Sequence, residues 1–333
     1  MPQRIISMSD GPALFDLLSY ARRGPDRTDR LSPAQVAQVA RTVQRAPEVV
    51  VKVSGGGTSA KGVVAHFKYL NRRPEFEIET DSGEHLQGRG SVKELVEDWD
   101  LELDAEEAKS AYSGRPGRKP VKLVHNIVLS MPAGTPAEGV LAASRAFARE
   151  QFALKNRYAM VLHTDQPHPH VHLVVKAMGV RGERLNIRRA TLRERRLEFA
   201  QHLRAQGIAA NATDRAVRGV TKPRKPDGIY RANENGRSTH ILERRESVAA
   251  ELLARNIRKE PGKADLLKTR QNVEQGWRAV SDTLCSNGKP GIAATVDRFL
   301  MEMPPPQTER EWMAAELLEH IRPPPVKERP IAR

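Results

Sequence analysis

Apolar residues recur along the middle of the chain in two patterns, one typical of strands and one typical of helices. Runs rich in β-branched residues predict strands over residues 48–53, 121–132, 157–163 and 170–176, with a weaker alternation at 75–80. Apolar residues at helical spacing predict helices over residues 62–73, 137–154 and 190–206, with an acidic helical region over 91–112. Because the two kinds of element are interspersed, we expect an α+β fold with a central, mostly antiparallel sheet flanked by helices.

The pattern is different on either side of this region. Residues 9–23 and a segment beginning at Ser32–Pro33 predict two short helices, the second with a serine N-cap and a proline in its first turn. After the linker TKPRKPDG, helices with weaker apolar faces are predicted over residues 240–256, 264–284 and 307–321. The end, RPPPVKERPIAR, is basic and rich in proline, which is typical of disorder. We therefore expect a helical N-terminal extension (1–47), a central domain (48–220) and a mostly helical C-terminal region (221–333).

The charge of the chain indicates a polyanionic partner. The 333 residues carry a formal net charge of +14, and the segment from Arg181 to Lys225 alone holds 13 Lys and Arg against 4 Asp and Glu. Such a concentration is typical of proteins that bind nucleic acid, although a solvated basic helix has the same composition. Aromatic residues make up only 5% of the chain, so a platform of stacked rings is not the obvious mode of binding.

Other features of composition bear on the compartment. The sequence has no apolar run of the roughly 18 residues that would span a membrane, and its beginning lacks the pattern of a signal peptide. The single cysteine, Cys285, excludes an intrachain disulfide framework and a site built from several thiolates. We expect a cytoplasmic protein.

Histidines gather in the stretch HTDQPHPHVHLVVK, residues 163–176. Side chains alternate between the faces of a strand, so His170 and His172 project to one face while the intervening valines and leucine project into the core. The short connection between His163 and His170 allows an antiparallel hairpin that places these two residues opposite each other. His163, His170 and His172 therefore predict a cage of three nitrogens, and His168 falls in the turn. A surface hairpin without a ligand is the simpler alternative.

Three protein ligands with an open position are typical of a metal that takes part in chemistry. Imidazole ligands suit Zn, Mn, Ni or Co, and Mg less naturally, so we expect one divalent ion of undetermined identity. Asp165, two residues beyond His163, could orient a ligand histidine, transfer a proton or simply form the turn.

A metal can activate water, or it can polarise a phosphoryl oxygen for a side-chain nucleophile. The second possibility requires a nucleophile, and Tyr69 in AHFKYLNRR is a candidate because basic residues surround it. A tyrosine with an ordinary pKa of about 10 is a poor nucleophile at neutral pH, and a nearby cation would favour its phenolate. From this segment alone, Tyr69 could equally be a packing residue.

The stretch HTDQPHPHVHLVV resembles the HxDxxHPHxHxxV motif of the MobP-type conjugative relaxases, which are HUH-type nucleases, and most closely the branch that nicks T-DNA borders. Three further segments resemble motifs of the same branch, in the same order. GGGTSAKGVVAHFKYLNRRPEFEIE resembles the first motif and places the nucleophile at Tyr69; HNIVLSMPAGT resembles the second and assigns Ser130 to DNA positioning. GIAANATDRAVRG resembles the segment that closes the nuclease domain and assigns Arg215 and Arg218 to DNA binding.

The likeness covers residues 49–220. Relatives carry their nucleophilic tyrosine nearer the chain start, so by position Tyr20 is an alternative to Tyr69 as the nucleophile. Tyr20 lacks the strand and glycine turn of the motif. The resemblance implies a relaxase in which Tyr69 attacks a phosphodiester at an origin of transfer, giving a 5′-phosphotyrosyl adduct that is later rejoined, with Asp165 assisting. Single-stranded DNA, relaxosome proteins and a type IV coupling protein would be partners, and the protein could travel with DNA to a recipient cell. An HUH replication initiator, a hydrolase and a non-catalytic accessory protein are the alternatives.

Overall fold

The computed structural model describes residues 30–73, 75–86, 90–112, 120–221, 232 and 236–321. The helix predicted over residues 9–23, Tyr20, nearly all of the predicted linker and the Pro-rich tail lie outside the described residues. By their contacts, the described residues fall into two compact units. One unit lies within Gln44–Ala212, and the other combines residues up to Val43 with the chain from Thr213 onward.

The first unit is built on a sheet of six strands in the order β1-β4-β6-β5-β2-β3, and every adjacent pair is antiparallel. The strands are β1 (Val50–Gly55), β2 (Ile78–Thr80), β3 (His85–Leu86), β4 (Val124–Ser130), β5 (Tyr158–His163) and β6 (His170–Lys176). Together with the helices around it, this antiparallel sheet confirms the predicted α+β fold.

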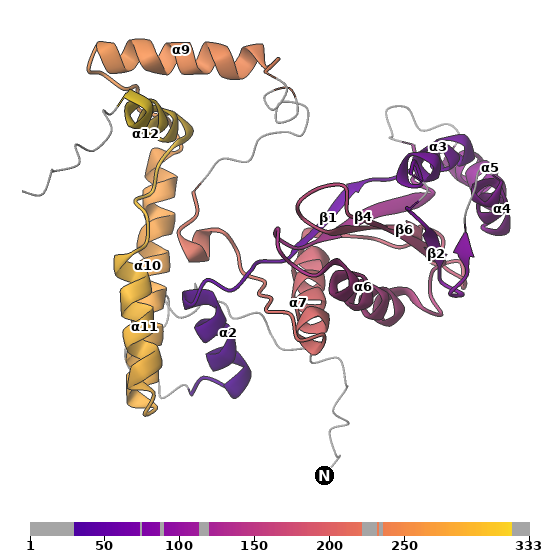
Figure 1. The fold of residues 1–333 in the computed structure, drawn as a ribbon, viewed down its shortest axis with the longest axis horizontal. Coiled ribbons are helices and arrows are strands. Elements are labelled where there is room, and N and C mark those ends of the chain that lie inside the picture. Colours follow the sequence, from indigo (N-terminus) through magenta and orange to yellow (C-terminus); the bar gives the residue numbers. More distant parts are fainter. Residues whose placement is uncertain are drawn as a thin grey trace, which may run out of the picture. The chain divides into compact units, whose positions relative to one another are not determined.

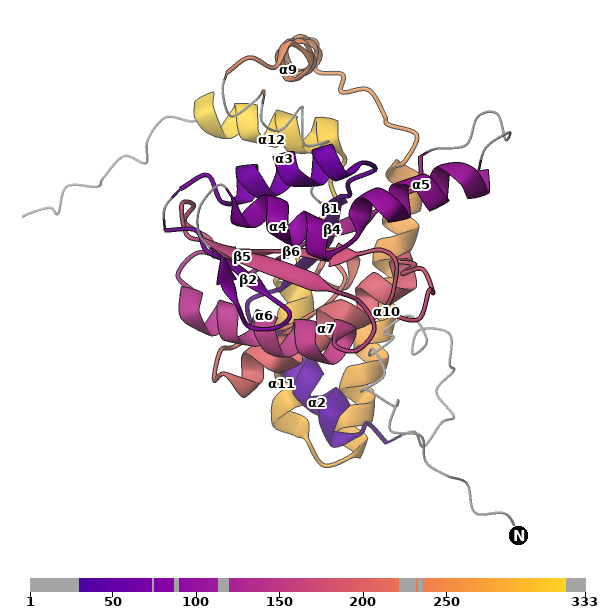
Figure 2. The same ribbon diagram turned by 90° about the vertical axis from the view of Figure 1, so that its right-hand side faces the viewer.

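Helices cover both faces of the sheet, as Figures 1 and 2 show. One face packs against α6 (Ala137–Phe152) and α7 (Arg189–Ala205), in a core that includes Val171 and Leu173 of β6. The other face packs against α3 (Ala60–Leu70), α4 (Ser91–Asp98) and α5 (Leu101–Tyr112), in a second core that includes Val174. Alternate residues of β6 therefore serve different sides of the sheet.

The glycine-rich turn between β1 and α3 brings the backbone into close contact with its neighbours. A Cβ atom on Gly57 would lie 2.4 Å from Cγ2 of Val63, and one on Gly56 would lie 2.3 Å from the carbonyl oxygen of Val124. Ser59 then caps α3, because its side chain accepts a hydrogen bond from the backbone nitrogen of Gly62. These contacts fix where α3 begins relative to β4.

The structure differs from the predicted elements in three places. The acidic helical region is two helices, separated where Asp100 adopts a φ of 50°. The weak strand predicted at residues 75–80 shrinks to β2, and its partner β3 is too short to leave an alternating pattern. In the second unit, helix α11 (Pro290–Met301) was not predicted, although Pro290 occupies a typical first-turn position.

The second unit is helical among its described residues. Helices α2 (Pro33–Val43), α10 (Lys263–Ser286) and α11 pack around the buried Trp277, and α9 (Thr239–Leu253) packs against α12 (Glu309–Ile321). The short 3-10 helix η1 (Ala216–Arg218) packs against α10. Within the described parts of the chain, no helix combines the length and apolar character needed to cross a membrane.

Candidate active site

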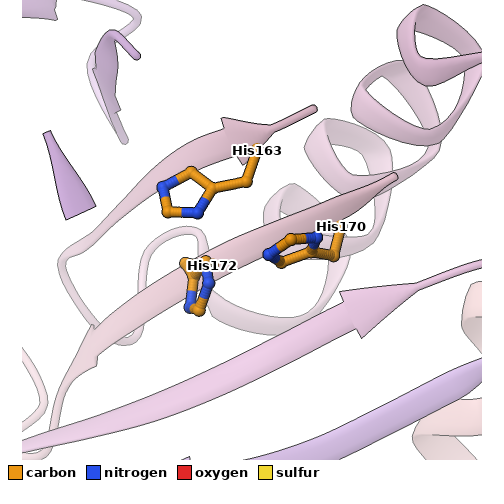
Figure 3. A group of neighbouring side chains, drawn as sticks. All are labelled: His163, His170 and His172. Atoms are coloured by element: carbon orange, nitrogen blue, oxygen red, sulfur yellow. The ribbon is translucent and has the colours of Figure 1, made fainter. Parts of the chain in front are cut away.

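His163, His170 and His172 converge on one face of the sheet. His163 ends β5 and pairs directly with His170 at the start of β6, and His172 is two residues farther along β6 on the same face. Their ring centroids lie 4.6–5.2 Å apart, and one nitrogen from each ring lies within 4.8 Å of the others. Figure 3 shows the three rings turned toward one another. The hairpin and the alternation predicted from the sequence bring all three side chains together.

Two of these rings are oriented by backbone carbonyl groups. Nε2 of His163 donates to the carbonyl oxygen of Leu70, 2.8 Å away, and Nδ1 of His170 donates to the carbonyl oxygen of His168, 3.2 Å away. A hydrogen bond that takes one ring nitrogen leaves the other as the lone-pair donor, which is how ligand histidines are held in many metal sites. Nδ1 of His163 and Nε2 of His170 are then the nitrogens available to a metal.

The third ring, His172, has a buried Nδ1 with no hydrogen-bond partner among the described residues. Burial lowers the pKa of His172 to about 3, with smaller contributions from His163 and His170. Burial also lowers the pKa values of His163 and His170 below their ordinary range. All three rings are therefore neutral near pH 7, the form in which imidazole binds a metal. The donor set fits a divalent ion.

Tyr69 lies at the C-terminal end of α3, beside this cluster. Tyr69 is 53% exposed, so the residue is accessible to a large substrate. The next residue, Leu70, provides the carbonyl oxygen that His163 contacts, so the helix end carrying Tyr69 is bonded to the histidine cluster. Phe76 reinforces this junction by stacking on His163 with ring centroids 4.3 Å apart.

Arg72 links Tyr69 to Asp165. Its guanidinium lies over the Tyr69 ring at 4.8 Å from the centroid, donates through Nη1 to the Tyr69 carbonyl oxygen at 3.3 Å, and forms an ion pair through Nη2 with the Asp165 carboxylate. Burial alone would raise the pKa of Asp165, but the charges of Arg72 and His163 lower it below its ordinary value. Oδ1 of Asp165 is buried without a hydrogen-bond partner among the described residues. The sequence showed Arg72 only as one of several basic neighbours of Tyr69.

Another histidine near the cluster was not singled out in the sequence. His66 lies one helical turn before Tyr69 on α3, and its Nε2 is buried without a hydrogen-bond partner among the described residues. Burial lowers the pKa of His66, and its charge contributes to the low pKa of His172. The only sequence signal was the position of His66 on the same helix as the tyrosine.

The three residues that the resemblance assigned to DNA binding do not belong to one compact unit of the structure. Ser130 is buried at the end of β4, opposite His170, and its hydroxyl donates to the carbonyl oxygen of Pro169 at 3.2 Å. Ser130 thus supports the turn that carries His170, and a direct contact with DNA stays a prediction. Arg215 is exposed just before η1 and Arg218 ends it, and both belong to the second unit. His168 is exposed; its carbonyl oxygen accepts a hydrogen bond from His170, and its ring centroid lies 5.6 Å from that of His170.

Comparison with known proteins gives a family for this region. Residues 82–208 match the family described as "Relaxase: MobA/VirD2-like, nuclease domain". The matched residues include the three histidines and Asp165 but begin after Tyr69. The predicted resemblance to the relaxases is confirmed. The T-DNA border endonuclease VirD2 of Agrobacterium fabrum is 28% identical to the chain over 211 residues, covering 59% of this chain and 46% of the relative. VirD2 of Rhizobium rhizogenes is also 28% identical, over 53% of this chain and 42% of the relative.

The likeness to relaxases is partial in length, since the chain spans less than half of these border endonucleases. A shorter match, 36% identical over 83 residues and a quarter of this chain, is to the Fe(3+) ions import ATP-binding protein FbpC of Brucella abortus. The sequence contains no GxxxxGK[ST] phosphate loop. No solved structure matches the chain.

Proposed function

We propose that this protein is a DNA relaxase that nicks one strand by transesterification to Tyr69. The observation that carries the proposal is the hydrogen bond between His163 and Leu70, which attaches the helix end bearing Tyr69 to the three-histidine cluster. A nucleophile and an electrophilic centre on adjoining elements are what a transesterase needs. The proposal assigns the nuclease domain to residues 48–220, of which the residues from Thr213 onward group by contacts with the second unit, and residues 1–47 and 221–333 to helical extensions.

The proposed step exchanges one phosphoester bond of the DNA for a phosphoester bond to tyrosine. The phenol oxygen of Tyr69 attacks the phosphorus of a phosphodiester and the bond from phosphorus to the 3′ oxygen breaks. The phenol loses its proton, and the departing 3′ oxygen becomes a hydroxyl. The product is a 5′-phosphotyrosyl adduct, and attack by a 3′-hydroxyl reverses the step without ATP, because the tyrosyl ester keeps the phosphodiester bond energy.

The side chains of the site divide the remaining tasks. His163, His170 and His172 would hold a divalent ion, which when bound supplies positive charge that polarises a phosphoryl oxygen. Asp165 would orient His163 or accept a proton, and its unpartnered Oδ1 leaves a free acceptor atom for the second role. His163 is oriented by Leu70, so the orienting role of Asp165 toward that ring is the less supported of the two.

Single-stranded DNA at an origin of transfer is the proposed substrate. The basic segment from Arg181 to Lys225 would contact phosphates, with Arg215 and Arg218 among the contacts, so the affinity should fall steeply as salt increases. Relaxosome proteins and a type IV coupling protein are the proposed partners. We propose that the protein acts in the cytoplasm before any transfer with DNA.

The test is incubation of the purified protein with manganese and supercoiled DNA that contains the region flanking its gene. A nicked circle with protein covalently attached at the 5′ end would support the proposal. A nick with a free 5′-phosphate would instead indicate hydrolysis, and binding without a nick would indicate an accessory protein; either result would overturn transesterification. Mapping the nick to a replication origin would favour the initiator alternative.

A further inference from the structure

Arg72 contacts three residues of the candidate site, Tyr69, Phe76 and Asp165. The guanidinium makes a cation–π contact with the Tyr69 ring at 4.8 Å and lies 5.4 Å from the centroid of the Phe76 ring. It also pairs with Asp165, which lies 93 positions farther along the chain. Because Phe76 itself stacks on His163, Arg72 lies where the nucleophile helix, the Phe76 segment and the histidine hairpin meet.

We propose that Arg72 is the positioning residue that holds Tyr69 in register with the histidine cluster, and that Asp165 serves as its anchor. The inference rests on the proposed transesterification, because it describes how the nucleophile of that reaction is aimed. Tyr69 itself is largely exposed, and no hydrogen bond fixes its side chain among the described contacts. The residues able to hold the ring are therefore those that contact its face and its backbone, and Arg72 contacts both.

The ion pair between Arg72 and Asp165 is partly shielded from water. The side chain of Asp165 is 9% exposed and that of Arg72 is 31% exposed, so the pair is better shielded from water than an ordinary surface pair. The neighbouring Arg73 provides a contrast, because its ion pair with Glu75 spans 3.6 Å between two side chains that are both more than half exposed. Both arginines lie near the Phe76 ring, Arg73 at 5.8 Å from its centroid, but Arg72 is the one that also lies over the Tyr69 ring and pairs with Asp165.

The shape of the guanidinium matters as well as its charge. Arg72 uses Nη2 for Asp165 and Nη1 for the Tyr69 carbonyl oxygen while its plane lies over an aromatic ring. A lysine ammonium cannot make these contacts together, because it is a compact charge without a planar fork. A misplacement of a reacting group by about 1 Å can slow a reaction by about 100-fold. The rate of attack should therefore respond to Arg72 much more than DNA affinity does.

The experiment compares Arg72→Gln with the matched control Arg73→Gln, since each removes one positive charge at adjacent positions. Single-turnover adduct formation is measured with manganese and an oligonucleotide that spans the nick mapped for the wild type. We expect Arg72→Gln to slow adduct formation at saturating DNA by about 100-fold with less than about threefold change in DNA affinity. Arg73→Gln should change both quantities by less than about threefold, and Arg72→Lys should restore little of the rate.

Two further readouts separate positioning from a general loss of structure. Added guanidinium ion at a concentration that does not denature the protein should partly rescue Arg72→Ala but not Arg73→Ala. In the metal-free protein without DNA, hydrogen exchange of the amides at residues 69–72 should be faster in Arg72→Gln than in Arg73→Gln. This second comparison does not depend on activity.

Several results would overturn the inference. The first is an equal loss of rate in the two glutamine variants, and the second is an Arg72→Gln variant that loses DNA affinity but keeps its rate. The others are full activity of Arg72→Lys and unchanged hydrogen exchange at residues 69–72. If the wild type itself forms no adduct, the proposed transesterification fails and with it the aiming of a nucleophile. The exchange comparison then still decides whether Arg72 and Asp165 join the two segments.

Discussion

Nε2 of His163 lies 2.8 Å from the carbonyl oxygen of Leu70, so a metal-site ring and the end of the tyrosine helix share one hydrogen bond. The bond takes the proton-bearing nitrogen of His163 and leaves Nδ1 for a ligand, and it also occupies a carbonyl group at the last turn of α3. One contact thus orients a candidate ligand and positions the residue next to the candidate nucleophile.

Tyr69→Phe should abolish the covalent adduct and leave DNA affinity within about twofold of the wild type, since only one exposed hydroxyl is removed. The measurement is denaturing gel electrophoresis of protein linked to a labelled oligonucleotide, together with a binding titration. Tyr20→Phe is the matched control and should form adduct normally. Adduct formation by Tyr69→Phe would move the nucleophile to another tyrosine.

His170→Ala should weaken metal binding and nicking together, because it removes one of three nitrogens that lie within 4.8 Å of one another. Calorimetric titration with manganese and a nicking assay give the two quantities. His168→Ala is the control, since His168 contributes its backbone carbonyl and its ring is exposed. Undiminished metal affinity in His170→Ala would remove that residue from the ligand set.

Metal binding near pH 7 should release few protons, because burial keeps the three histidines below their ordinary pKa range, with His172 at about 3. Ligands that are already neutral have no proton to lose when the ion binds. Calorimetry in buffers with different ionisation enthalpies measures the number released. We expect less than about half a proton per ion, and release of one or more would contradict the buried, neutral cluster.

The stability of the metal-free protein should fall as the pH decreases below about 6.5. Histidines in the unfolded chain become protonated through that pH, while His172 stays neutral in the folded state down to about 3, so the unfolded state binds more protons. Each such histidine adds up to about 1.4 kcal/mol per pH unit to the slope of the free energy of unfolding. His66 and His125 contribute with the same sign.

Urea unfolding between pH 7.5 and 5 measures this slope. His172→Gln should make it shallower by about 1 kcal/mol per pH unit, since glutamine does not titrate in this range. The exposed His240 offers the control substitution His240→Gln. An identical slope in wild type and His172→Gln would contradict the assignment.

Gly57→Ala should lower the free energy of unfolding by about 1–3 kcal/mol, because the new Cβ would lie 2.4 Å from Cγ2 of the buried Val63. Gly90→Ala is the matched control, since a Cβ there would meet nothing within 4 Å. Thermal or urea unfolding of both variants provides the comparison. Equal stability of the two would show that the turn accommodates the methyl group.

The sequence predicted the histidine cluster because its geometry is local. A short hairpin fixes which residues face each other, and strand alternation fixes the face, so His163, His170 and His172 could be placed without knowledge of the rest of the fold. The sheet followed from the same reasoning, since its long strands have strong β-branched patterns. The strand β3 is two residues long and gave no periodic signal.

The surroundings of the cluster could not be predicted in this way. The contacts of Arg72 with Asp165 and of His163 with Leu70 each join residues 93 positions apart, and no local pattern encodes which basic residue of a turn meets a distant carboxylate. His66 was missed because a single histidine on an amphipathic helix looks like any half-buried polar residue. The likeness to relaxases indicated Tyr69 as the candidate nucleophile, whereas the contacts around Tyr69 required the tertiary structure.

Odd and even positions of strand β6 face opposite sides of the sheet. His170 and His172 face the candidate site, while Val171 and Leu173 are completely buried in the core against α6 and α7. A slip of pairing by one residue would push two imidazoles into that core and expose two large apolar side chains to the other face. Misregistered forms would thus lose both stability and ligand geometry. The packing energy of the core therefore favours the one register in which the histidine cluster forms.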